Sequence, residues 1–150
     1  MIKISRLADY AVVVLTALAE QGGGLMSAAA IAQKTLLPEP TVSKVLKFLA
    51  RDGIIKSIRG ANGGYKLACP AANINVAQII QAVDGPVSLT ACVDGSNEVC
   101  DYHAGCPVNG RWDDVNMAVQ SALESVTLAD MMGARSFPKR SKETEIHGCI

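Results

Sequence analysis

The sequence predicts a mainly α-helical fold with one small β-hairpin. Apolar residues recur every three or four positions through five segments of the 150-residue chain. One short stretch breaks this period, because two apolar runs there flank a glycine-rich turn. Hydrophobic residues make up 49% of the chain and aromatic residues only 4%, so the core of one domain plus an extension must be aliphatic.

Serine residues mark the starts of the first two helices. Ser5 precedes a helix that is expected to run to about Glu20, and Ser27 precedes a shorter one that runs to about Lys34. A serine at such a position accepts a hydrogen bond from an N–H group that the helix leaves unpaired. Three successive glycines, residues 22–24, separate the two helices.

A third helix is expected from about Thr41 to Asp52, with Pro40 in its first turn. Two strands follow, at residues 54–59 and 65–68, on either side of the glycine-rich turn. Three helices and then a hairpin is the order of a winged helix-turn-helix domain, whose third helix enters the major groove of DNA. The alternative is an ordinary small α+β domain with a solvated basic helix.

The charge distribution favours DNA as a partner of the first half. Residues 1–66 contain nine Lys/Arg and four Asp/Glu, net +5, whereas residues 67–150 contain five and ten, net −5. Only the first half therefore suits a polyanion. The residues expected to contact DNA lie on the outer face of the third helix and in the hairpin: Ser43, Lys44, Lys47, Arg59, Asn62 and Tyr65.

Two further helices are expected, at Val76 to about Asp84, capped by Asn73 or Asn75, and from Pro107 to about Ala129. The second of these carries a long apolar stripe with no evident cover in its own chain. Such a stripe favours burial against the same helix of a second copy, in a homodimer. The alternative is packing on its own domain. The predicted interface residues are Trp112, Val115, Val119, Ala122 and Val126.

Three of the five cysteines lie in one segment without helical or strand periodicity: Cys92, Cys100 and Cys106. Their Cys-x7-Cys-x5-Cys spacing is wider than the Cys-x2-Cys pairs of zinc sites. Thiolates suit zinc and iron–sulfur clusters, and a loop this wide suits a bulky cluster better than a single ion. Two alternatives are a cluster-free thiol sensor that forms disulfides and three idle thiols.

The predicted organisation is a DNA-binding domain at residues 1–84, a cysteine loop at 85–106, a dimerisation helix at 107–130 and a disordered tail at 131–150. An odd number of cysteines favours a reducing compartment, the cytoplasm, and no apolar run is long enough to span a membrane. The chain has no nucleotide-binding loop and no paired acid and base residues, so an enzyme is not expected.

Three features together resemble one family, over about residues 1 to 132. They are the run Arg-Gly-Ala-Asn-Gly-Gly-Tyr at residues 59–65, the run Asp-Tyr-Ala-Val at residues 9–12, and the three-cysteine loop. The family is the Rrf-two family of bacterial winged-helix repressors. The resemblance implies a homodimer that binds double-stranded operator DNA and holds an iron–sulfur cluster, with 4Fe–4S favoured over 2Fe–2S. It also implies control of iron–sulfur assembly or iron-homeostasis genes.

The resemblance also implies the cluster ligands, which are Cys92, Cys100, Cys106 and one further donor. One branch of the family has a histidine three residues after its last cysteine, but this chain has Asn109 there. In another branch an acidic residue, which aligns with Asp9, reaches the cluster from the partner subunit. His103 is the local alternative. Cys69 is expected to be structural, and no role is assigned to His147 or Cys149.

Overall fold

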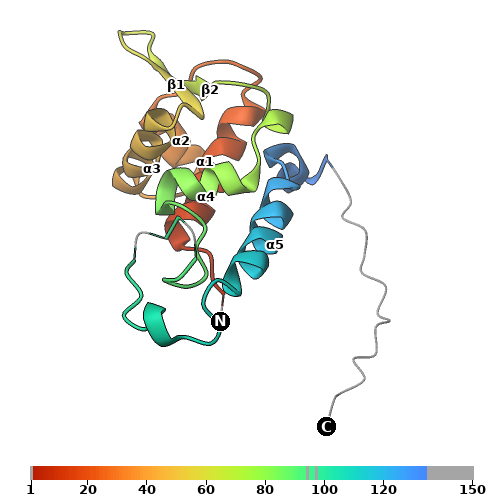
Figure 1. The fold of residues 1–150 in the computed structure, drawn as a ribbon. Helices are drawn as coiled ribbons and strands as arrows, with labels where there is room; N and C mark the ends of the chain where they lie inside the picture. The colour runs from red at the N-terminus through yellow and green to blue at the C-terminus, as the bar shows by residue number, and fades with distance from the viewer. Residues whose placement is uncertain (1, 94, 97, 135–150) are drawn as a thin grey trace.

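The computed structural model describes residues 2–93, 95–96 and 98–134. Its α-helices are α1 (Arg6–Glu20), α2 (Ala28–Thr35), α3 (Glu39–Arg51), α4 (Val76–Asp84) and α5 (Trp112–Glu124). Strands β1 (Ile55–Ile58) and β2 (Gly64–Leu67) form an antiparallel hairpin. Single 3-10 turns lie at Ala71–Asn73 and His103–Gly105, and a π-helical turn lies at Asp130–Ala134. The prediction of a mainly helical chain with one hairpin is confirmed (Figure 1).

Helix α1 is the centre of the fold, since it packs against α2, α3, α4 and β2. Helix α4 lies between α3 and α5 and contacts both (Figure 1). The core where these helices meet is aliphatic, as the composition predicts. Its largest fully buried side chains are Leu15, Leu18, Ile31, Leu46, Leu49, Ile74, Ile79 and Leu128.

Three predicted helix caps are present. The Ser5 hydroxyl accepts a hydrogen bond from Ala8 N at 3.0 Å, and Ser27 does the same for Ala30 N at 3.1 Å. Asn75, rather than Asn73, caps α4, and its side chain and that of Gln78 form a reciprocal capping box. The bounds predicted for α4 are therefore correct.

Helix α3 begins at Glu39, two residues earlier than predicted. The carbonyl of Pro38 accepts bonds from Thr41 N at 3.0 Å and Val42 N at 3.1 Å. Pro40 lies in the first turn, where an N–H group has no acceptor within the helix, so its missing N–H costs no helical hydrogen bond. The turn before this helix holds Leu36 in the left-handed region, at φ 60°.

The hairpin is fixed to the helices by its second strand. Met26, in the segment between α1 and α2, exchanges two backbone hydrogen bonds with Tyr65, at 3.0 and 2.8 Å. A Cβ atom on the neighbouring Gly64 would lie 2.7 Å from the carbonyl oxygen of Met26, closer than such atoms approach. Glycine at this position therefore allows the strand to pair on both sides.

The last long helix is shorter than predicted. It begins at Trp112 rather than Pro107, because Gly110 has a left-handed φ of 73°, which a continuous helix cannot contain. It ends at Glu124 rather than near Ala129. Thr127 and Asp130 hydrogen-bond each other's backbone N–H and side chain, which starts a separate turn after the helix.

The segment after α5 returns to the helical domain. Val76 N donates to Val126 O at 2.9 Å, and Leu128 N donates to Ile74 O at 2.8 Å. Leu128 is fully buried in the core. The expectation that the last helix lacks cover in its own chain is thus wrong in part, because α5 packs against α4 and its C-terminal extension joins the core.

In the described part of the chain, none of the helices has the length and apolar character that crossing a membrane requires.

Candidate functional site

The outer face of α3 presents a basic, solvent-exposed surface. Its inner face is formed by the buried side chains of Val42, Val45, Leu46 and Leu49. Ser43, Lys44 and Lys47 lie outside this stripe and are exposed. An α-helix fits the major groove, and lysine and serine side chains on such a face have the chemistry to contact phosphates and base edges.

The hairpin turn supplies the second part of this surface. Arg59 and Asn62 are exposed in the turn, which projects away from the helical body (Figure 1). Tyr65 differs from them, because it is half-buried and packs against the core, and its backbone pairs with Met26. The structure thus brings five of the six predicted DNA-contacting residues to the surface of α3 and the hairpin turn, whereas Tyr65 lies in β2 against the core.

Arg51, the last residue of α3, contacts the protein itself. Its guanidinium donates to the carbonyl of Ala82 in α4 at 2.9 Å and to the carboxylate of Asp52 at 3.0 Å. It also lies over the ring of Phe48, 5.2 Å from the centroid. Arg51 therefore ties the end of the third helix to α4.

The three loop cysteines are free, half-buried thiols. Their soft donor chemistry fits an iron–sulfur cluster. Within the described residues, no three His, Cys, Asp or Glu side chains come together as a metal site, so the loop has to close around any cluster that it binds. Cys92 Sγ lies 3.2 Å from Thr90 Oγ1, and Cys106 borders an open depression of about 400 Å³.

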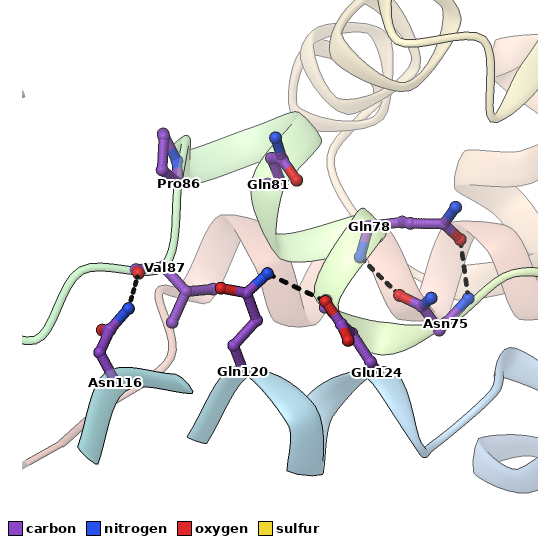
Figure 2. A pocket seen from close by; sticks show the side chains of 9 residues that line it. Asn75, Gln78, Gln81, Pro86, Val87, Asn116, Gln120 and Glu124 are labelled. Carbon is purple, nitrogen blue, oxygen red and sulfur yellow. Dashed lines mark hydrogen bonds between the residues drawn. The ribbon is translucent and has the colours of Figure 1, made fainter. Parts of the chain in front are cut away.

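Asn116 in α5 attaches the start of the cysteine loop to the helix. This side chain is only 5% exposed. Its Nδ2 donates to Val87 O at 2.9 Å, and its Oδ1 accepts from Leu89 N at 3.0 Å. Figure 2 shows Asn116 beside Gln120 and Glu124, on the α5 side of a pocket of about 290 Å³ that α4 completes. Sequence reasoning missed Asn116; the only signal is a polar residue within an apolar helical stripe.

The predicted fourth ligands have different surroundings. Asp9 is exposed in the first turn of α1. Ser5, which caps this helix, donates to Asp84 Oδ1 at 2.8 Å, so the start of α1 lies beside the end of α4, where the cysteine loop begins (Figure 1). Asn109 is exposed in the turn before α5. The side chain of His103 lies outside the described residues.

Cys69 belongs to the helical domain rather than to this loop. Cys69 is half-buried next to Leu18, Leu67 and Pro70 and packs against the core, as expected for a structural residue. His147 and Cys149 lie outside the described residues.

The predicted dimer residues divide into two groups. Trp112, Val115 and Ala122 are exposed on α5. Val119 is half-buried on the same helix, and Val126 lies beyond its end in the segment that pairs with the start of α4. In this single chain, Trp112 and Val115 are 42% and 45% exposed, and they lie three residues apart on neighbouring turns of α5.

Known proteins resemble this chain over most of its length. The family model Rrf2, described as an iron-dependent transcriptional regulator, matches residues 4–134. The transcriptional regulator IscR of Cereibacter sphaeroides is 31% identical over 134 residues, which cover 87% of this chain and 86% of that protein.

Two solved structures are similar over nearly the whole chain. CymR, the global cysteine regulator of B. subtilis, is 32% identical with a TM-score of 0.69, and the match covers 91% of this chain and 100% of CymR. IscR of T. potens is 30% identical with a TM-score of 0.65, over 89% of this chain and 88% of that one.

Proposed function

The chain belongs to the Rrf2 family of DNA-binding transcriptional regulators, and from this premise we propose that it is a repressor whose operator affinity depends on an iron–sulfur cluster. It would bind double-stranded operator DNA as a homodimer and control iron–sulfur assembly or iron-homeostasis genes. One observation carries the proposal: a loop with three free thiols lies between the helical domain that presents the basic α3 face and helix α5, which presents an exposed apolar face.

The DNA-binding part follows from charge and shape. Lys44 and Lys47 would contact phosphates, Ser43 would lie at the base edges, and Arg59 and Asn62 of the hairpin turn would contact the backbone or the minor groove. Tyr65 would fix β2 to the helical domain rather than contact DNA. Because Trp112, Val115 and Ala122 are exposed, we place the dimer contact on this side of α5, with Val119 at its edge.

The sensing part rests on the donor set. Cys92, Cys100 and Cys106 would hold the cluster, which when bound supplies irons that oxygen, nitric oxide or iron shortage can remove. Asp9 of the partner subunit is our choice for the remaining position, because it is exposed in the first turn of α1, whose capping residue Ser5 bonds to Asp84 where the loop begins. A carboxylate binds iron less firmly than a thiolate, so this position would be the labile one. We favour 4Fe–4S over 2Fe–2S, because the wide loop suits a bulky cluster.

The cluster would regulate DNA binding by changing the position of α5 and therefore the distance between the two α3 helices of the dimer. When the cysteines lose their common ligand, the loop loosens and α5 shifts. Two recognition helices must match the spacing of two operator half-sites, so a shift at the dimer contact changes affinity for DNA.

A cluster-free thiol sensor is the second candidate. It is favoured by the absence of a preformed three-residue metal group in the described residues and by the similarity to a global cysteine regulator. In that case two of the three loop thiols would lose two electrons and two protons to a peroxide and form a disulfide.

The test uses duplex DNA that the protein itself selects from random sequence. We expect the protein purified without oxygen to bring iron and sulfide with it and to change its affinity for this duplex when a chelator removes them. A protein that never carries iron, but that changes affinity when peroxide oxidises its thiols, would support the second candidate instead.

A further inference from the structure

Helix α5 buries a polar side chain where packing alone would favour an apolar one. Asn116 is 5% exposed, and both functional groups of its amide are used. Its Nδ2 donates to Val87 O (Figure 2), and its Oδ1 accepts from Leu89 N. A buried amide without partners is costly, so this position suits a side chain that both donates and accepts at short reach. Asparagine thus holds the segment at residues 87–89 against the helix by two hydrogen bonds to its backbone.

The held segment leads directly to the first loop cysteine. Thr90 Oγ1 lies 3.2 Å from Cys92 Sγ, and Val93 N donates to Thr90 O at 3.3 Å, which closes a turn around Cys92. Val93 is buried at the end of this turn. Cys92 therefore cannot move far without moving backbone that Asn116 holds.

Helix α4, which precedes this segment in the chain, is attached to the end of α3. Arg51 at the end of α3 donates to Ala82 O near the end of α4, three residues before the segment leaves that helix at Gly85. Asn116 itself lies one helical turn after Trp112 and next to Val115, which are exposed. One short stretch of chain thus joins the α3 end, the first loop cysteine and the α5 face that carries Trp112 and Val115.

We propose that Asn116 is a positioning residue that passes the state of the Cys92 thiolate to helix α5. The inference rests on the proposed function, that the state of the cysteine loop controls DNA binding. When Cys92 is held by a ligand, the segment at residues 87–93 is held with it, and Asn116 keeps α5 in the matching position. When Cys92 is released, the two hydrogen bonds to Asn116 are the route by which α5 follows.

The test compares Asn116→Leu with Gln120→Leu in the full-length protein. Leucine has the same number of side-chain heavy atoms as asparagine and the same branching at Cγ, but it neither donates nor accepts, so it removes both bonds to the segment. Gln120 lies one turn later and borders the same pocket, but it bonds only to Glu124 on α5 in the described structure. Each protein is loaded with iron and sulfide without oxygen, and its affinity for the selected duplex is measured before and after a chelator strips it.

The readout is the ratio of the two affinities together with the visible spectrum. We expect a ratio of about tenfold or more for the wild type and for Gln120→Leu, within the usual range of coupling between sites. Asn116→Leu should keep the wild-type spectrum, since all its thiols remain, while its ratio falls close to one. A purely structural role would weaken both states equally and leave the ratio unchanged, which would overturn the inference.

The remaining outcomes are also decisive. If the wild-type ratio is itself close to one, the proposed function fails and this inference fails with it. If Asn116→Leu does not fold, Asn116→Asp is used, which still accepts from Leu89 N but cannot donate to Val87 O when ionised; its ratio should also fall. If both variants fail to fold, Asn116 serves the fold alone and the inference is wrong.

Discussion

Removing Lys44 and Lys47 should lower the salt dependence of DNA binding by an amount that follows from the fold. The two side chains are exposed one turn apart on α3, opposite its buried stripe. A homodimer presents each lysine twice, so each Lys→Ala change removes two phosphate contacts. At about 0.9 per phosphate, the slope of log affinity against log salt should fall by about 1.8 for each single variant and about 3.6 for the double variant.

The assay is a salt titration of fluorescence anisotropy with the selected duplex. When the salt concentration rises from about 50 to about 200 mM, the affinity of both proteins for DNA falls. The factor by which it falls should be roughly 100 times smaller for the double variant than for the wild type. Lys34→Ala is the matched control, because it removes the same charge from α2, where Lys34 Nζ pairs with Glu20 at 2.9 Å. Unchanged slopes for the α3 variants, or an equal fall for Lys34→Ala, would refute the placement of DNA on α3.

Three further predictions concern dimerisation, stability and the fourth ligand. Val115→Glu should yield monomers that bind operator weakly, and it tests the contact more cleanly than Val119→Glu because Val119 is half-buried in its own chain; dimers at micromolar concentration by ultracentrifugation would contradict it. Leu36→Gly should stabilise the fold by about 1 kcal/mol, because Leu36 is 90% exposed at φ 60°. Calorimetry should then show a Tm higher by about 2–4 °C, and an unchanged Tm would show that the left-handed backbone of Leu36 does not destabilise the fold. Asp9→Ala should leave the cluster assembled but shorter-lived in air; if it behaves as wild type while His103→Ala does not, the ligand is His103.

The helical domain could be predicted closely because its signals are local. Ser5, Ser27 and Asn75 each satisfy N–H groups of the helix that follows, and such bonds depend only on neighbours in sequence. The hairpin could be located for the same reason, since its turn glycines are required by contacts within a few residues or by one close approach to Met26.

The region around the last helix shows where sequence reasoning failed. The left-handed Gly110 and the Thr127 and Asp130 capping pair could have been recognised as helix ends, but the apolar stripe suggested a continuous helix. The role of Asn116 could not have been recognised. Its partners are the backbone groups of Leu89 and Val87, which lie 27 and 29 positions earlier in the chain. Every residue type has such backbone groups, so they leave no signal in the sequence.

The site itself could be predicted as a set of residues but not as a geometry. The cysteine spacing indicates soft ligands, and the charge distribution indicates which half binds DNA. Neither shows that Tyr65 packs against the core or that Arg51 hydrogen-bonds to α4, because both depend on which side of an element faces the core.

The most direct measurement of the central claim is purification without oxygen, followed by visible absorption and counts of iron and acid-labile sulfide per chain. We predict a coloured protein with about four irons and four sulfides. Single Cys→Ala changes at Cys92, Cys100 and Cys106 should each abolish the colour, whereas Cys69→Ala should leave it. A colourless, iron-free wild-type protein whose thiols all titrate as free would contradict the cluster and leave the thiol sensor as the account of this chain.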